Sequence, residues 1–156
     1  MTAAVADPVL REVRWQDLAG LAELEEELFG PEAWSLRSWW GELAGRPRRE
    51  YVLLEDDAGI AGYAGIDHVG DVADVMTIAV LPRRRGSGLG RRLLEELVAR
   101  ARAAGSLRLV LEVREDNVPA RRLYEDRGFA HVRTRTHYYP DGVDARVLAL
   151  DLTEEP

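Results

Sequence analysis

The 156-residue chain has an ordinary globular composition, with 46% hydrophobic and 31% charged residues, and a formal net charge of -7. It contains no cysteine, and all 21 of its basic residues are arginine. These absences exclude disulfides, zinc–thiolate sites and thiol nucleophiles, as well as Schiff-base chemistry and a Walker-type phosphate loop, which needs a lysine. The negative charge argues against nucleic acid as a main partner, because nucleic-acid-binding domains usually carry a broad basic face.

The length of the chain suits one domain, which we assign to residues 1–156. No stretch approaches the ~20 consecutive apolar residues of a membrane-spanning helix. The N-terminus, MTAAVADPVLREV, lacks the basic and then apolar layout of a secretory signal, so we expect a cytoplasmic protein. The three histidines, His68, His131 and His137, are scattered along the chain, and we expect no metal site.

The first part of the chain predicts a strand followed by two helices. VLREV (Val9–Val13) alternates between apolar and polar residues, as a half-buried strand does. A second helix is expected over Leu36–Ala44, with Ser35 as its N-cap. The first helix ends at Gly30 and is indicated by five residues at helical spacing: Leu18, Leu21, Leu24, Glu25 and Leu28.

Three β-rich runs and a helix follow. YVLLED and IAGYAGIDHV predict a hairpin around Asp57–Gly59, and VADVMTIAVL predicts a third strand that ends at Pro82. The next helix has one apolar side and closes at Gly105. That side is formed by Leu93, Leu94, Leu97, Val98 and Ala101.

The last part of the chain predicts a strand, a helix and two further strands. LRLVLEV (Leu107–Val113) is the strand, and Asn117 and Pro119 open a helix that runs through Tyr124 to Gly128. FAHVRTRTHYY and ARVLALDL then alternate as strands on either side of PDG. This order predicts a mixed α/β domain in which a helix crosses over between two parallel strands.

The stretch Pro82–Leu94, PRRRGSGLGRRLL, concentrates positive charge around exposed backbone in an acidic chain. Its glycines allow the amides of Gly86–Gly90 to turn toward one point, and the helix that begins near Gly90 adds unpaired N–H groups. Mobile positive charge is expected from Arg83, Arg84, Arg85, Arg91 and Arg92. These features favour a pyrophosphate as the ligand; the alternative is a strand-to-helix turn with a solvated basic rim.

The spacing of this loop argues against a dinucleotide-binding fingerprint, because Arg91 stands where G-x-G-x-x-G requires its third glycine. Arg85–Gly90, RGSGLG, instead fits the pattern R/Q-x-x-G-x-G/A and resembles the coenzyme A pyrophosphate loop of the GNAT N-acetyltransferases. The resemblance extends over nearly the whole chain. It implies an α/β fold whose central mixed sheet has about seven strands flanked by about four helices.

The resemblance also implies which residues contact acetyl-CoA. The strand before the loop is expected to lie along the pantetheine arm through Ile78, Ala79 and Val80. The pyrophosphate is expected to bind the loop at Arg85, Gly86, Ser87, Gly88, Leu89, Gly90 and Arg91.

A carboxylate on an inner strand raises the question of catalysis. Leu109, Leu111 and Val113 share one face of their strand and leave Glu112 on the other. We expect apolar neighbours to desolvate this carboxylate, an environment that suits a general base. The alternative is an exposed face on which Glu112 pairs with an arginine such as Arg114.

The segment LEVREDNVPARRLYEDRGF looks like the block LEVR-x-x-N-x-x-A-x-x-LY-x-x-x-GF of the RimI-type ribosomal-protein alanine N-acetyltransferases, a branch of the same family. Position by position, the resemblance implies that Glu112 is the general base and Tyr124 the general acid. Asn117 falls on a coenzyme A contact, although it also suits the helix N-cap and can serve as both. Without the resemblance, Tyr124 is interpreted as a core tyrosine with its hydroxyl at the rim.

Two further blocks resemble the peptide side of this branch. AWSLRSW (Ala33–Trp39) is similar to its PWS segment, and HYYPDGVDARVLAL is similar to its closing NYYP…DA block. Ala33 in place of proline and His137 in place of asparagine depart from the pattern on that side. The residues implied to line the peptide are Trp34, Ser35, Tyr138 and Tyr139. For each of them, packing of an aromatic loop over a core is the alternative.

The expected function is transfer of the acetyl group of acetyl-CoA to the N-terminal α-amine of a protein, with the N-terminal alanine of the eighteenth small-subunit ribosomal protein as the family's substrate. Because the chain has no cysteine, direct transfer within a ternary complex is the simplest route. No metal, nucleic acid or membrane is expected to take part. Two alternatives stay open: an acetyltransferase of several protein N-termini or small amines, and a non-catalytic acyl-CoA sensor, against which the presence of both Glu112 and Tyr124 argues.

Overall fold

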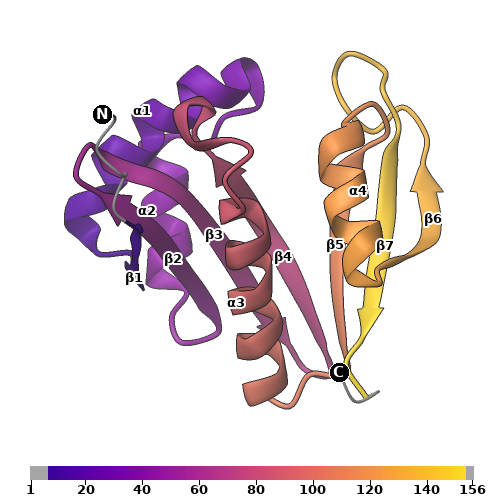
Figure 1. Cartoon of the computed structure of the whole chain (residues 1–156). Coiled ribbons are helices and arrows are strands. Elements are labelled where there is room, and N and C mark those ends of the chain that lie inside the picture. Colours follow the sequence, from indigo (N-terminus) through magenta and orange to yellow (C-terminus); the bar gives the residue numbers. More distant parts are fainter. Residues whose placement is uncertain (1–6, 154–156) are drawn as a thin grey trace, which may run out of the picture. The chain divides into compact units, whose positions relative to one another are not determined.

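The computed structural model of the chain describes residues 7–153, in which seven strands form one mixed sheet in the order β1-β2-β3-β4-β5-β7-β6. The strands, labelled in Figure 1, are β1 (Val9–Glu12), β2 (Arg49–Asp56), β3 (Gly59–Val69), β4 (Val72–Val80), β5 (Arg108–Arg114), β6 (Ala130–Arg135) and β7 (Ala145–Asp151). The helices are α1 (Leu18–Phe29), α2 (Leu36–Ala44), α3 (Leu89–Ala103) and α4 (Val118–Arg127), with short 3-10 turns at Trp15–Asp17, Gly30–Glu32 and Pro82–Arg84. The expected mixed α/β class and order of elements are confirmed.

The described chain folds as two compact units. The first contains the residues up to Gly65 together with Thr77–Leu93, and the second contains Ile66–Met76 together with the residues from Leu94 on. The elements β3, β4 and α3 therefore contribute residues to both units. Within residues 7–153, none of the helices is long and apolar enough to cross a membrane. Over the same range, no three His, Asp or Glu side chains gather as metal ligands would.

In the first unit, α1 and α2 each bury one side. Leu18 and Leu21 of α1 are fully buried, and the helix ends before Gly30, whose φ of +54° suits glycine. α2 has the bounds expected from the sequence, because the Ser35 hydroxyl accepts a hydrogen bond from the Ser38 amide at 3.1 Å and caps the helix.

The strands of the first unit carry an aromatic layer. β1 and β2 pair antiparallel, with Val9 opposite Glu55. Tyr51 of β2 is buried, and Gly65 of β3 makes room for its ring, because a Cβ at Gly65 would lie 2.1 Å from Tyr51 Cε1. Trp39 of α2 packs edge-on against the same ring, with the centroids 5.4 Å apart. The close approach at Gly65 therefore shapes the aromatic core of this unit.

The second unit is built on β5, β6 and β7, with β7 antiparallel to both of its neighbours. Val72 and Asp74 of β4 lie opposite Arg108 and Val110 of β5 in a parallel pair, which confirms the expected crossover through α3. All six residues of β6 are exposed, and a register shift between His131 and Arg133 interrupts its pairing with β7. Charged side chains and such irregularities are typical of a sheet edge.

The bounds of α4 follow from local signals at both ends. The Asn117 side chain accepts a hydrogen bond from the Ala120 amide at 3.3 Å, and Pro119 occupies the first turn, where a missing N–H is tolerated. At the other end, Gly128 has a φ of +107° and its amide bonds back to the Glu125 carbonyl at 3.0 Å. This short helix therefore holds Tyr124 in a defined position.

Candidate functional site

Two glycines of the loop after β4 adopt left-handed backbone conformations. Gly86 and Gly88 have φ angles of +78° and +83°, in the left-handed region that residues with a Cβ rarely adopt. A Cβ built at either glycine would meet no atom within 4 Å, so the space beside the loop is open. The Arg92 amide donates the first hydrogen bond of α3 to the Gly88 carbonyl, at 3.1 Å. The amides of Leu89 and Gly90 precede that bond and therefore have no acceptor within the helix.

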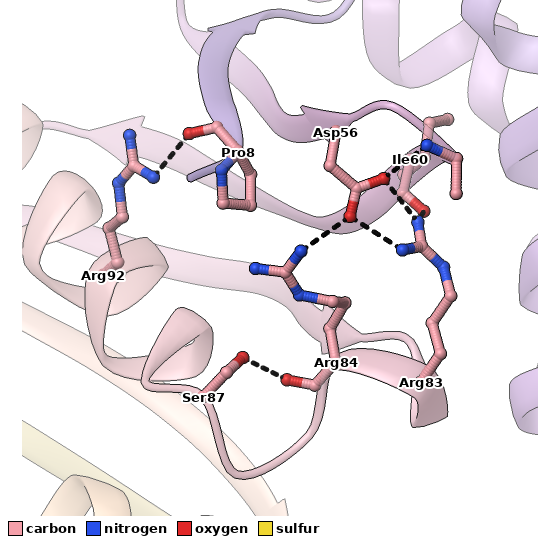
Figure 2. A network of polar contacts seen from close by, with 8 residues as sticks. Pro8, Asp56, Ile60, Arg83, Arg84, Ser87 and Arg92 are labelled. Atoms are coloured by element: carbon pink, nitrogen blue, oxygen red, sulfur yellow. Dashed lines mark hydrogen bonds and ion pairs between the residues drawn. The ribbon is translucent and has the colours of Figure 1, made fainter. Parts of the chain in front are cut away.

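Three arginines beside the loop are tied to the chain, so the expectation that they supply mobile charge is wrong. Arg83 and Arg84 both donate hydrogen bonds to the Asp56 carboxylate at the end of β2, at 2.7 and 2.9 Å (Figure 2). The side chain of Asp56 is only 3% exposed, and the hydrogen bond from Arg83 lowers the pKa of its carboxyl to about 2. Arg92 donates to the Pro8 carbonyl at 2.6 Å. Two guanidiniums share one carboxylate, so this cluster keeps a net positive charge.

Other side chains of the loop also fold back on the chain. Arg85 Nε donates to the Val80 carbonyl at 3.3 Å. The Ser87 hydroxyl donates to the Arg84 carbonyl, as Figure 2 shows. Arg91 is exposed on the first turn of α3. The first unit thus brings the expected pyrophosphate loop next to the end of β4.

The end of β4 presents backbone groups on the edge that faces away from β3. The Leu81 amide, just after β4, donates to the Ala61 carbonyl of β3 at 2.9 Å. Because backbone polar groups alternate between the two edges of a strand, those of Ile78 and Val80 are on the same edge as each other and away from β3. Of the three residues expected along a pantetheine arm, Ala79 is buried and the other two are half-buried. The backbone groups of Ile78 and Val80 therefore have the direction that such a contact requires.

In the second unit, Glu112 lies on the exposed face of β5, and the expected alternation along this strand is confirmed. The expected desolvation is wrong: the side chain is 30% exposed, and its carboxylate forms an ion pair with Arg135 Nε of β6 at 2.8 Å. It also accepts a hydrogen bond from the Tyr138 hydroxyl, which raises the pKa of that tyrosine. The alternative of an exposed carboxylate paired with an arginine therefore describes Glu112, with Arg135 as the partner instead of Arg114.

Tyr124 of α4 is 8% exposed and packs against Phe129, with the ring centroids 5.8 Å apart. Burial, with a smaller contribution from Tyr139, raises the pKa of Tyr124 to about 12. The phenol therefore stays protonated throughout the neutral range and can donate a proton or a hydrogen bond. The hydrogen bond from the Ala120 amide confirms Asn117 as the N-cap of α4, while its contact with coenzyme A stays a prediction.

The loop between β6 and β7 is fastened by Arg114. The Arg114 guanidinium donates to the Asp141 carboxylate at 2.6 Å and lies over the Tyr139 ring, 4.8 Å from its centroid. Tyr138 packs edge-on against Tyr139, with the centroids 5.1 Å apart. Because Tyr138 also contacts Glu112, the second unit brings both tyrosines of the expected peptide side close to the expected base.

His137, which departs from the family pattern, fits the backbone at its position. Its φ is +52°, and among the residues that the structure describes it alone adopts a left-handed conformation without being glycine. Asparagine and histidine tolerate this region better than most residues do. The His137 amide donates to the Asp144 carboxylate at 2.8 Å, and its Nδ1 lies 3.2 Å from the Gly142 carbonyl oxygen. Histidine is therefore compatible with the left-handed conformation that the backbone adopts at this position.

Trp34 and Ser35 lie in the first unit and have structural contacts there. Trp34 is half-buried and packs edge-on against Trp39 and Tyr51, at centroid distances of 5.0 and 6.1 Å. Ser35 is exposed and caps α2. These contacts agree with the alternative interpretation, in which the two residues have a structural role. Binding of a peptide by either residue stays a prediction.

The roles of three charged residues, two of them in the candidate site, were not expected from the sequence. Asp56 and Arg135 are far in sequence from the arginines and the glutamate that they contact, and no local pattern indicates such pairs. Glu25 is 2% exposed, and burial raises its pKa to about 7 against the opposing effect of the Tyr63 hydroxyl. The sequence does indicate this burial, because Glu25 occupies one of the helically spaced positions of α1 that otherwise hold leucine.

Comparisons with known proteins agree with these features. The model of the acetyltransferase (GNAT) family matches residues 11–129. The chain is 38% identical over 157 aligned positions to the N-alpha-acetyltransferase RimI of Mycobacterium tuberculosis, covering 97% of each protein. It is 34% identical over 135 positions to the ribosomal protein bS18-alanine N-acetyltransferase of Haemophilus influenzae, covering 85% of this chain and 88% of that protein.

A solved structure gives the same result for the fold. The ribosomal-protein-S18-alanine N-acetyltransferase from Escherichia coli matches with a TM-score of 0.85 at 31% identity, covering 96% of both chains. The family match also spans the glycine loop, β5 and the whole of α4, which carry the expected coenzyme A and catalytic residues. The chain therefore belongs to the acetyltransferase (GNAT) family, in its RimI-type branch, and is an acetyl-CoA-dependent N-acetyltransferase.

Proposed function

We propose that this enzyme acetylates the N-terminal α-amine of a protein in the cytoplasm, and that the N-terminal alanine of ribosomal protein bS18 is its substrate. The observation that carries the proposal is similarity along most of the chain to relatives that are named for this chemistry. One is called an N-alpha-acetyltransferase, and the other is named for the alanine of bS18. The chain covers 97% and 88% of these two proteins, so the similarity extends over nearly the whole of each relative.

Acetyl-CoA binds, in this proposal, through its pyrophosphate at the glycine loop and through its pantetheine arm along the end of β4. The open space beside Gly86 and Gly88 and the helix-start amides of Leu89 and Gly90 support the first contact. The direction of the Ile78 and Val80 backbone groups, away from β3, supports the second, and their amides can also stabilise the oxyanion that forms on the thioester carbonyl. Asn117 contributes a further coenzyme A contact.

The amine of the substrate attacks the thioester carbonyl directly, with Glu112 as the base. A peptide α-amine has a pKa of about 7.7–8.0, so roughly a tenth of it is already neutral at pH 7. A lysine amine, at about 10.4, is neutral in well below one part in a thousand. An exposed carboxylate such as Glu112 is therefore adequate for an N-terminal amine, to which it can connect through a water. This difference favours N-terminal over lysine acetylation.

Tyr124 assists the departure of coenzyme A as a thiolate. A thiol has a pKa of about 8.5, whereas burial raises the pKa of Tyr124 to about 12. Net transfer of the phenolic proton to the thiolate is therefore unfavourable. The main contribution of Tyr124 in this proposal is a hydrogen bond that stabilises the negative sulfur as it forms. Tyr124 keeps its own proton, and the released thiolate takes a proton from solvent.

The proposal is tested by following free thiol after mixing the enzyme with acetyl-CoA and a peptide that begins with the first residues of bS18. We expect thiol release with this peptide and none with its N-acetylated form, which offers no α-amine. A panel of peptides that differ only in the first residue measures the preference for alanine. Release with polyamines but not with peptides would instead indicate a small-amine acetyltransferase. Coenzyme A binding without release from any acceptor would indicate a sensor.

A further inference from the structure

The turn Pro82–Arg84 leads into the glycine loop and is fastened by one carboxylate from another element. Asp56 is the last residue of β2, and its side chain is 3% exposed. Its Oδ2 accepts hydrogen bonds from Arg83 Nη1 at 2.7 Å and from Arg84 Nη1 at 2.9 Å, and its Oδ1 accepts a second bond from Arg83 at 3.0 Å (Figure 2). A single buried acid thus fixes two consecutive side chains of the turn.

Both arginines connect this acid to the surrounding backbone. Arg83 also donates to the Ile60 carbonyl at 3.0 Å, which ties the turn to the start of β3. The Arg84 carbonyl accepts a hydrogen bond from the hydroxyl of Ser87, the residue between the two left-handed glycines of the loop (Figure 2). Hydrogen bonds therefore connect Asp56 through Arg84 to Ser87, in the part of the loop that is proposed to bind the pyrophosphate.

We propose that Asp56 is a positioning residue for acetyl-CoA binding: by clamping Arg83 and Arg84, it holds the glycine loop in its anion-binding conformation before the ligand arrives. This proposal rests on the proposed role of the loop in binding the pyrophosphate. It opposes the simple electrostatic expectation, in which a carboxylate beside the loop repels the ligand and occupies two guanidiniums that could bind phosphate. The apparent affinity for a ligand is proportional to the fraction of the protein that is already in the binding-competent conformation. The affinity gained by holding the loop in that conformation can therefore exceed the affinity lost through repulsion by the carboxylate.

The variant Asp56→Asn distinguishes the two effects because they have opposite signs. Loss of the repulsion alone would strengthen coenzyme A binding by a factor of about two to five. Loss of positioning that leaves about a tenth of the loops in the competent conformation raises the Kd about tenfold. We expect the second result by calorimetry, with kcat at saturating substrates within about twofold of the wild type. The neighbouring Asp57→Asn makes the same change of charge at an exposed position and should leave the Kd within about twofold.

A second variant separates geometry from charge. Asp56→Glu keeps the negative charge but lengthens the side chain by one methylene, so its carboxylate cannot occupy the same position between the two arginines. We expect coenzyme A to bind severalfold more weakly to Asp56→Glu than to the wild type. If Asp56→Asn does not fold, this measurement tests the positioning role by itself. Hydrogen exchange of the ligand-free protein should also be faster at the amides of Arg84 and Arg85 in either variant, because these amides donate to the Leu81 and Pro82 carbonyls in the ordered turn.

An unchanged or tighter Kd in Asp56→Asn, or wild-type affinity in Asp56→Glu, would overturn the positioning role. The result is distinguishable from failure of the proposed function through Gly88→Val, which changes the loop itself. If Gly88→Val weakens coenzyme A binding and the Asp56 variants do not, the loop is the binding site and only the role of Asp56 is wrong. If Gly88→Val has no effect, the loop is not the coenzyme A site, and the proposed roles of the loop and of Asp56 both fail, whereas thiol release from the peptide still tests the acetylation itself.

Discussion

The partners of Glu112 limit how this side chain can act as a base. Its carboxylate is exposed and shared between Arg135 and Tyr138, so its role depends on its position and on the neutral fraction of the amine rather than on desolvation. An ion pair at such an exposed position contributes about 0–1 kcal/mol to the free energy of unfolding. Substitutions here therefore test chemistry with little effect on the fold.

Glu112→Gln should lower kcat about 100-fold, the lower end of what general-base catalysis contributes, and should leave the Kd of coenzyme A unchanged. The measurement is thiol release at saturating acetyl-CoA and peptide, together with calorimetric binding. Arg135→Gln is the matched control, because it breaks the same ion pair but keeps the carboxylate, and its kcat should stay close to that of the wild type. A normal rate in Glu112→Gln, or an equal loss in both variants, would remove the base assignment.

Tyr124→Phe should slow turnover about tenfold or more, the effect of removing one hydrogen bond to a developing charge. The near-isosteric change preserves the packing against Phe129, so the melting temperature should change little. Because the pKa of Tyr124 is about 12, the wild-type kcat should show no alkaline decline caused by this group below about pH 11. Unchanged turnover in the variant would return Tyr124 to a packing role.

At the scale of helices, strands and loops, the bounds that could be predicted are those set by local interactions. Ser35 and Asn117 cap helices that begin where the sequence indicates, and Gly30 and Gly128 stand where helices end. Alternation correctly placed Glu112 on the face opposite the buried residues of β5. These features depend on neighbours within one or two turns of chain, which a sequence pattern records directly.

The contacts of the candidate site that could not be predicted join residues from different elements. The expectation that Glu112 is desolvated failed because Arg135 reaches it from β6, a fully exposed strand. The expectation of mobile charge failed because Asp56, at the end of β2, clamps Arg83 and its neighbour. Neither partner is near its contact in sequence. The coenzyme A and catalytic roles came from the family resemblance, because a glycine turn and a buried tyrosine such as Tyr124 each have an ordinary structural explanation.

The glycine loop as an element is tested by Gly88→Val. With φ at +83° and open space around it, a side chain at this position causes no collision, so the cost arises from the backbone conformation, about 1–2 kcal/mol or more for a β-branched residue. The loop should relax to another shape, and we expect coenzyme A binding to weaken about tenfold or more by calorimetry. Gly70→Val, at φ +63° in the turn after β3 and also in open space, is the control for strain alone. Equal affinities in the two variants would argue against the loop as the pyrophosphate site.

At the scale of the whole molecule, the stability of the fold is coupled to pH through Glu25. This residue of α1 is 2% exposed, and burial raises its pKa from 4.5 to about 7, although the Tyr63 hydroxyl favours the charged form. The folded protein therefore binds this proton more tightly than the unfolded chain does. The stabilisation is fully present below pH 4.5, decreases as the pH rises through the interval up to about 7, and is absent above it.

Replacing Glu25 by glutamine removes the titration while nearly keeping the shape of the side chain. Glu25→Gln should therefore increase the free energy of unfolding at pH 8 by up to about 3 kcal/mol and change it little at pH 4.5, where the wild-type carboxyl is neutral in the fold. Urea unfolding at the two pH values gives both numbers. Glu26→Gln, at the next and exposed position of α1, makes the same chemical change without burial and should shift neither value by more than about 0.5 kcal/mol. A gain for Glu25→Gln that is the same at both pH values would mean that better packing, rather than loss of a buried charge, accounts for the stabilisation.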